Sequence, residues 1–144
     1  EGFSYLDQIE SFFGSGYSEE DEKKIRLLQA EVLRATGKDQ SAQKILEEIV
    51  RVHPLEGAAL LMLGQIAWKQ KEYATASLRF ERSAKDSDYE VRALIEHARM
   101  MVSQNQYEKA STLLERAQTI DPQPQVAKYL QSINNLLASS RIRF

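Results

Sequence analysis

The sequence contains no cysteine, which excludes disulfide bonds, cysteine-ligated zinc sites and thiol nucleophiles. Because a lack of cysteine suits reducing and oxidising surroundings alike, the cytoplasm and the bacterial periplasm are both compatible with it. The longest uninterrupted apolar run, Ala58–Leu63, is far shorter than the roughly 20 residues of a membrane-spanning helix. We therefore expect no membrane span in this chain, which begins at Glu1 rather than Met and is expected to be a fragment or a processed product.

Neither sign of charge dominates, since 19 basic and 21 acidic residues leave a net charge of −2. A nucleic-acid partner is not expected, because such binding requires a clustered basic surface. Patterns typical of β-strands are absent as well, with no sustained two-residue alternation and few β-branched clusters. Apolar residues recur instead at helical spacing, as in Leu60, Leu63 and Ala67 and again in Ala76 and Phe80. The sequence therefore predicts an all-α protein.

The chain repeats itself every 34 residues. The segment EYATASLRFERSAKDSD, residues 72–88, returns as QYEKASTLLERAQTIDP, residues 106–122. A fixed period of roughly 20 to 50 residues indicates stacked structural units. Three series of aligned residues carry the pattern: Ala30, Gly64 and Ala98; Ala42, Ala76 and Ala110; and Leu46, Phe80 and Leu114.

The sizes of these residues predict how the units pack. The small residues let two helices of a hairpin approach closely, and the large ones fill the space between successive hairpins. Gly37 and Asn105 occupy equivalent breaks between the two helices, and both tolerate the left-handed backbone found at helix ends. Pro54 and Pro122, two periods apart, stop the helices before them.

The Leu63-Gly64 pair, Tyr73 and Tyr107, the alanine series, Phe80 and the two prolines resemble tetratricopeptide repeats over about residues 23–124. The resemblance implies a right-handed α-solenoid of three helical hairpins, residues 23–56, 57–90 and 91–124. Residues 1–22 are assigned to an N-terminal helix and linker, and residues 125–144 to a capping helix and tail. Gln29 and His97 depart from the family pattern, because they align with Leu63, where a large apolar residue is expected.

Both ends of the chain carry an apolar helical stripe. In the capping helix the stripe lies about one residue out of the repeat register, and it comprises Val126, Tyr129, Leu130, Ile133, Leu136 and Leu137. In the N-terminal segment it comprises Phe3, Leu6, Ile9 and Phe13, with Tyr5 and Phe12 beside it. This segment is either the second helix of a preceding repeat or an independent helix that covers its own groove or a neighbour's.

The resemblance also implies that the first helix of each hairpin lines a concave groove for a peptide or helix of a partner protein. Lys24, Glu31 and Ala58 complete the lining positions, whose main members are Leu27, Arg34, Leu61, Gln65, Trp68, Arg92, Ile95, Arg99 and Val102. Apolar and cationic residues together suit a partner with apolar anchors and some acidic character. The alternative for Trp68 is internal packing, and for Arg92 and Arg99 it is a solvated charge or an internal ion pair.

One subgroup of the family grips terminal carboxylates with a clamp of lysine, asparagine and arginine. The clamp positions here hold Leu27, Glu31, Met62 and Glu96, with only Arg92 matching as a cation. Chaperone-tail binding is therefore not expected, because the two glutamates would repel a carboxylate.

Catalytic patterns are missing. His53 lies in a connection, His97 lies on the packed face of a helix, and neither has a third group spaced to orient it. Asp86, Asp88 and Glu90 alternate like the start of a calcium loop, but the required glycine is missing, and Asp88 is better explained as a helix N-cap. We predict a non-catalytic scaffold without cofactor or metal.

Two other roles remain open. The chain could associate with itself as a homodimer through Phe3, Phe12 and Phe13 or through the C-terminal helix. It could also be the interaction half of a larger enzyme or of a secretion or envelope-assembly protein.

Overall fold

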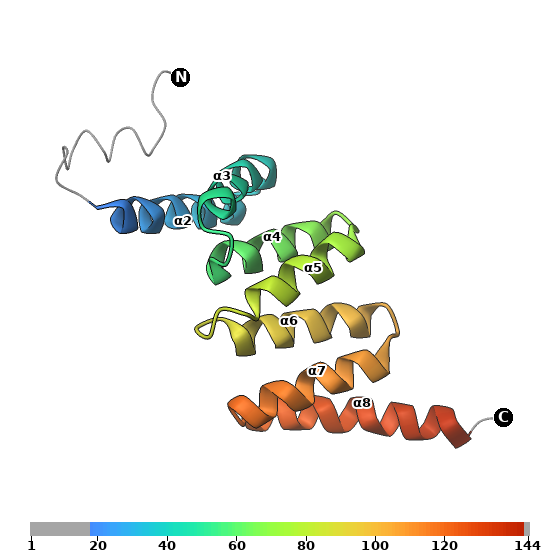
Figure 1. Ribbon diagram of the computed structural model, residues 1–144. Helices are drawn as coiled ribbons and strands as arrows, with labels where there is room; N and C mark the ends of the chain where they lie inside the picture. The colour runs from blue at the N-terminus through green and yellow to red at the C-terminus, as the bar shows by residue number, and fades with distance from the viewer. Residues whose placement is uncertain (1–17, 143–144) are drawn as a thin grey trace.

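The computed structural model describes residues 18–142, which form seven α-helices and no strand. Their bounds are α2 (Glu19–Ala35), α3 (Asp39–Val52), α4 (Gly57–Lys69), α5 (Tyr73–Ser83), α6 (Glu90–Ser103), α7 (Tyr107–Ile120) and α8 (Pro124–Ile142). The helices pair as hairpins α2–α3, α4–α5 and α6–α7, which stack in order, and α8 packs on α7 (Figure 1). The predicted all-α solenoid is confirmed.

The first described helix starts earlier than the repeat period suggests. Ser18 and Asp21 form a capping box, in which the Asp21 amide donates to Ser18 Oγ at 3.1 Å and the Ser18 amide donates to Asp21 Oδ2 at 3.3 Å. Acidic residues fill the first turn, where their negative charges interact favourably with the positive end of the helix dipole and stabilise the helix. Residues 19–22 therefore belong to α2, whereas the sequence assigns them to the linker.

The turns inside the three hairpins share one backbone geometry. Gly37, Lys71 and Asn105, spaced by the repeat period, adopt φ values of 81°, 64° and 61°. In the middle turn the Glu72 amide donates to the Ala67 carbonyl at 2.8 Å, which satisfies a carbonyl at the end of α4. The left-handed positions at Gly37 and Asn105 match the prediction. The one at Lys71 was missed because lysine carries no signal for such a turn.

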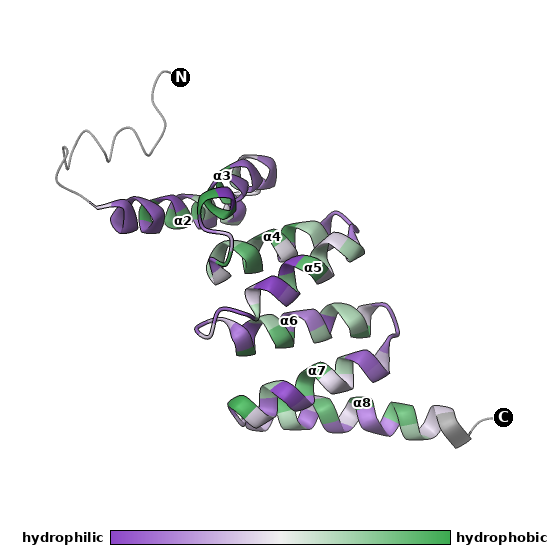
Figure 2. Ribbon diagram, in the orientation of Figure 1, coloured by the Kyte–Doolittle hydropathy of each residue, from purple (hydrophilic) through white to green (hydrophobic). Residues whose placement is uncertain are grey.

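Packing inside the hairpins follows the predicted sizes. Ala42, Ala76 and Ala110 are fully buried, as are Leu46, Phe80 and Leu114. A Cβ atom on Gly64 would lie 2.5 Å from Cε1 of Phe80, so the ring occupies the space that a larger residue would fill. The middle helix α4 is apolar over most of its length and is buried between its neighbours (Figure 2). The core continues from hairpin to hairpin as two apolar clusters.

The connection from α5 to α6 corrects one prediction. The helix N-cap is Tyr89 rather than Asp88, and no side chain caps it. Asp86 organises this connection, because its carboxylate accepts from the Asp88 amide at 3.1 Å and from the Gly57 amide at 2.9 Å. The Asp86 side chain therefore joins the end of the second hairpin to the start of α4.

The last helix packs one residue out of register with the repeats, as expected. A shift of 34 residues carries Ala93 and Met100 of α6 to Ala127 and Asn134, whereas α8 buries Val126 and Ile133 instead. Ser111 of α7 adds a hydrogen bond to Asn134 at 2.8 Å. This register covers the apolar side of the third hairpin.

Candidate binding surface

Helices α2, α4 and α6 place the predicted lining residues along one side of the stack, called here the first-helix face. It comprises Leu27, Arg34, Gln65, Trp68, Arg92, Ile95, Arg99 and Val102. Arg92 and Arg99 are exposed, and the other six are partly buried. Trp68, Ile95 and Val102 pack with their inner surfaces against the larger apolar cluster. Their outer surfaces are accessible to solvent.

Leu61 does not belong to this face. Its side chain is only 3% exposed and lies in the larger apolar cluster. Helices α4 and α6 contact each other directly, so a side chain at this position is enclosed between them. The prediction that Leu61 lines the groove is therefore corrected, and Leu61 is a core residue.

Three first helices are joined by a chain of polar contacts that the sequence did not reveal. Arg34 Nη1 of α2 donates to Gln65 Oε1 of α4 at 2.7 Å, and Gln65 Nε2 donates to Glu96 Oε1 of α6 at 3.4 Å. Arg99 completes the chain, because its Nη1 donates to Glu96 Oε2 at 3.2 Å. We call these four residues the polar ladder.

The cations of this face have partners within the chain. Arg99 forms its ion pair with Glu96 one turn away, as the alternative for this residue supposed. The guanidinium of Arg92 lies 5.5 Å from the ring centre of Tyr89, within the range of a cation–π contact. Arg92 is exposed, and no carboxylate among residues 18–142 forms an ion pair with it.

Tyr129 of α8 is partly buried against the larger apolar cluster. Burial raises the pKa of the Tyr129 hydroxyl, and the positive charge of Arg99 opposes that shift. No sequence signal separates this tyrosine from the packing residues of α8, because all of them lie on the same apolar stripe.

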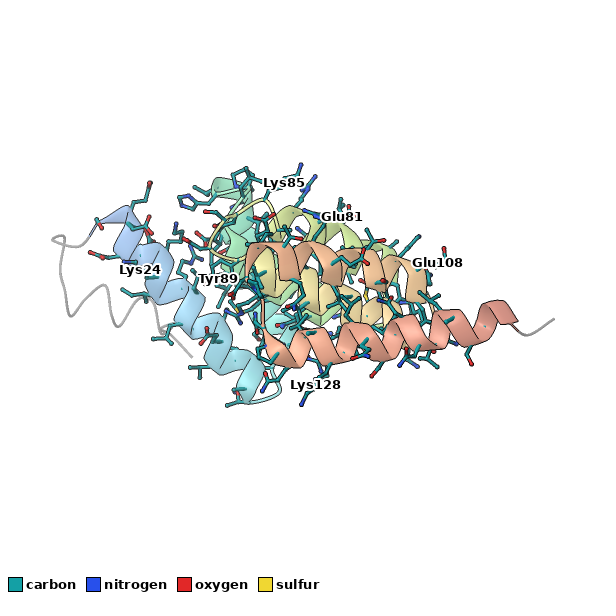
Figure 3. All side chains as sticks on the ribbon, turned by 90° about the horizontal axis from the view of Figure 1, so that it is seen from below. Lys24, Glu81, Lys85, Tyr89, Glu108 and Lys128 are labelled. Carbon is teal, nitrogen blue, oxygen red and sulfur yellow. The ribbon has the colours of Figure 1, made fainter. Side chains whose placement is uncertain are left out.

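The second helices form a different surface on the other side of the stack. Glu81 of α5 and Lys85, just after α5, project from one edge in Figure 3, and Lys128 of α8 projects from the opposite edge.

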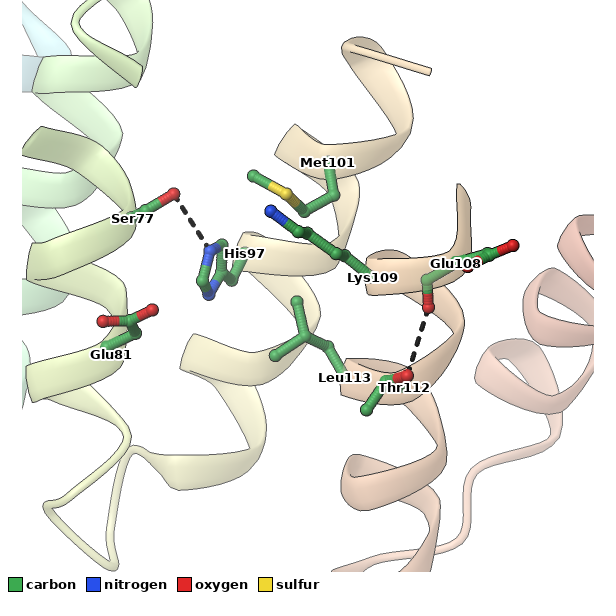
Figure 4. A pocket seen from close by; sticks show the side chains of 8 residues that line it. All are labelled: Ser77, Glu81, His97, Met101, Glu108, Lys109, Thr112 and Leu113. Atoms are coloured by element: carbon green, nitrogen blue, oxygen red, sulfur yellow. Dashed lines mark hydrogen bonds between the residues drawn. The ribbon is translucent and has the colours of Figure 1, made fainter. Parts of the chain in front are cut away.

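An open pocket of about 510 Å³ lies on the second-helix side between α5, α6 and α7 (Figure 4). Its lining residues are Ser77, Glu81, His97, Met101, Glu108, Lys109, Thr112 and Leu113.

His97 forms part of this pocket, and it is 7% exposed. Its Nε2 lies 3.1 Å from Ser77 Oγ, and its ring centre lies 5.8 Å from that of Phe80. Burial lowers the pKa of the imidazole, while Glu81 raises it and Lys109 lowers it to lesser extents. These contacts are those of the packed histidine that the sequence suggests.

The Ser77–His97 pair resembles the start of a nucleophile–base arrangement, but it is a contact between two packed helices and has a counterpart in the next repeat. Ser111 occupies the same repeat position as Ser77, and its hydroxyl also bonds to a side chain of the following helix, since it donates to Asn134 Oδ1. A catalytic base also needs a third group to orient it. Within residues 18–142 the imidazole makes no second hydrogen bond.

Three further observations concern residues 18–142 alone. No group of three or more acidic, histidine or cysteine residues in this range could hold a metal ion. None of the helices from α2 to α8 combines the length and the apolar character that crossing a bilayer requires. The predicted self-association residues Phe3, Phe12 and Phe13 lie outside the described residues.

Comparison with protein-family models gives two matches, both to tetratricopeptide repeat models. One covers residues 27–89 and the other covers residues 91–124. Together they span the second half of α2, helices α3 to α7 except Glu90, and the residues of the first-helix face. No curated protein matches the chain.

Proposed function

The chain belongs to the tetratricopeptide repeat family, and from this premise we propose that it binds a segment of another protein on its first-helix face. Repeats of this family generally mediate protein–protein interaction, and they typically act as non-catalytic scaffolds. We extend both properties to this chain. The partner segment lies across α2, α4 and α6 as an extended peptide or an amphipathic helix.

The polar ladder is the observation that supports this proposal most directly. The contacts of Gln65 with Arg34 and Glu96 hold side chains from three helices in fixed positions. A surface whose side chains are already ordered loses less conformational entropy when a partner binds. The half-buried apolar residues Trp68 and Ile95 lie on the same face and supply the anchor positions.

The chemistry of the face defines the partner segment. Trp68, Ile95 and Val102 accept apolar side chains, and tryptophan is enriched among the residues that dominate binding energies. Arg92 favours an acidic residue in the partner, since its charge is accessible. Glu31 and Glu96 stand where a carboxylate clamp would need polar or basic residues. The segment is therefore internal to the partner rather than a free C-terminus.

The test is selection of peptides from a random displayed library, followed by affinity measurement on variants. Trp68→Ala combined with Ile95→Ala should weaken the selected peptides by at least about tenfold. Trp68 is the single tryptophan of the chain, so its fluorescence also reports binding to the native protein.

A matched control replaces apolar residues on the second helices. Leu78 and Ile120 are each 48% exposed, so Leu78→Ala combined with Ile120→Ala should leave peptide affinity unchanged. Far-ultraviolet circular dichroism and thermal unfolding verify that both double variants remain folded. If the selected peptides bind equally well to the Trp68/Ile95 variant, or if only the control weakens them, the first-helix face is not the binding site.

A further inference from the structure

We propose that the outer face of α2, formed by Ile25, Leu28 and Val32, is a docking surface for residues 3–13 of the same chain. The docked segment takes the place of the second helix of a preceding hairpin. This surface is separate from the first-helix face, so the proposal does not depend on the peptide-binding function.

The exposure of α2 is unusual for a first helix of this stack. Leu28 and Val32 are 62% and 49% exposed. The residues 34 positions later in α4, Met62 and Ile66, are 6% and 2% exposed and pack in one cluster with Leu46 of the preceding helix α3. Met100 of α6, one further period along, is also fully buried. The position of Val32 is thus buried in both later first helices, whereas that of Leu28 is buried as Met62 in α4 and is held by the partly buried Glu96 in α6. In α4, both positions pack in the apolar cluster that includes the hairpin before it.

The N-terminal segment carries the complementary pattern. Phe12 falls in the repeat register of Leu46, Phe80 and Leu114, all of which are fully buried on second helices. Leu46 lies in one apolar cluster with Met62 and Ile66, the equivalents of Leu28 and Val32, so the register directs Phe12 to the face of α2. Large exposed apolar surfaces usually mark a contact. Residues 3–13 have the apolar spacing that matches the outer face of α2.

Gln8 distinguishes residues 3–13 from the second helix of a complete repeat. It aligns with Ala42, which is fully buried in the cluster that contains Ala30 of its own hairpin. A glutamine does not fit such a close contact between paired helices. It does suit a helix that packs on α2 alone and leaves its other side in water.

The connecting chain has the required length. A helix that ends at Phe13 leaves residues 14–18 before α2 begins at Glu19. The connections from one hairpin to the next helix span residues 53–56, 84–89 and 121–123. Gly14 and Gly16 permit the tight turn that so short a connection requires. The segment can therefore reach α2 of its own molecule.

Amide hydrogen exchange of the full 144-residue chain tests the proposal. Residues 3–13 should exchange at least about tenfold more slowly than in a free peptide of residues 1–17, at every protein concentration. Leu28→Asp combined with Val32→Asp should abolish this protection, because buried carboxylates oppose docking. Leu78→Asp combined with Leu136→Asp, at exposed apolar positions elsewhere, should leave it unchanged.

A cross-link tests the contact independently of stability. The native chain has no cysteine, so Phe12→Cys with Leu28→Cys creates a single pair of thiols. The proposal expects rapid disulfide formation within one molecule, because a disulfide requires Cα atoms closer than about 7 Å. Phe12→Cys with Leu136→Cys should not form one. A negative result with Leu28→Cys, together with exchange of residues 3–13 as fast as in the free peptide, overturns the proposal. Protection or cross-linking that appears only between molecules identifies a second copy as the occupant and also overturns it.

Discussion

The ring of Phe80 fills the space beside Gly64, since a Cβ atom on Gly64 would lie 2.5 Å from the ring. The repeat register places Ala30 opposite Leu46 and Ala98 opposite Leu114, and the members of each pair lie in one apolar cluster. A glycine thus stands opposite the large ring, and alanines stand opposite the smaller leucines. The two positions are coupled in size because close packing leaves no room for an added methyl group.

Gly64→Ala should therefore lower the free energy of unfolding by about 1–3 kcal/mol, despite the higher helix propensity of alanine. Phe80→Leu alone should also destabilise, because it leaves a cavity beside Gly64. The double variant restores the pairing found in the other hairpins, so it should be more stable than the sum of the single changes predicts. Urea unfolding of the four proteins measures this coupling, and strictly additive effects would contradict it.

Lys71→Gly should stabilise the protein by about 0.5–1 kcal/mol. The left-handed backbone at Lys71, with φ of 64°, costs an L-residue about 1–2 kcal/mol, which exceeds the entropy that glycine adds to the unfolded chain. Gln70→Gly is the matched control, because Gln70 has φ of −81° and gains nothing from glycine. Thermal unfolding should give a higher midpoint for Lys71→Gly and a lower one for Gln70→Gly. A lower midpoint for both variants would show that the turn is not strained.

The free energy of unfolding should fall as the solution becomes acidic, because protonation of His97 favours the unfolded chain. Burial holds the pKa of this imidazole below its ordinary value of 6.5, so the unfolded chain binds the proton at a higher pH than the folded chain does. The contribution to stability is complete above pH 6.5 and is lost as the pH falls through the folded-state pKa. His97→Leu introduces the leucine that Leu63 provides one repeat earlier. This change should make the free energy of unfolding less dependent on pH below pH 6.5.

The charged groups around His97 act in both directions. Glu81 from α5 favours the protonated ring, Lys109 from α7 opposes it, and Glu108 lines the same pocket. Chemical unfolding at a series of pH values compares the native chain with His97→Leu and with His53→Leu, which removes the other histidine. If the profile flattens only in the His53 variant, the pH dependence arises from His53 and the prediction for His97 is wrong.

Gln65→Ala should lower the free energy of unfolding by about 0.5–1.5 kcal/mol, because it removes two hydrogen bonds that cross between hairpins. Gln70→Ala provides the comparison, since Gln70 makes one exposed contact, with Gln43, at 3.3 Å. Urea unfolding should show the larger loss for Gln65. Equal effects for the two glutamines would mean that the polar ladder contributes nothing beyond a surface contact.

Part of the candidate surface could be predicted from the sequence and part could not. The helical period places Trp68, Ile95 and Arg99 on one side of the first helices, because every helix turns by the same angle per residue. It cannot tell how closely α4 approaches α6, and that distance is what buries Leu61. It cannot show that Gln65 bridges two charged residues, because each of them lies 31 positions away along the chain.

The sequence by itself determined the helices, their 34-residue period and the sizes of the residues that pack between them. These properties depend on local backbone preferences and on side-chain volumes, which recur at the same phase in every unit. Only the tertiary structure decided which lining residues stay accessible, which charges are paired and that the outer face of α2 remains uncovered by the described residues. Those outcomes depend on the distances between neighbouring helices, which arise from all the contacts of the stack together and from no single segment.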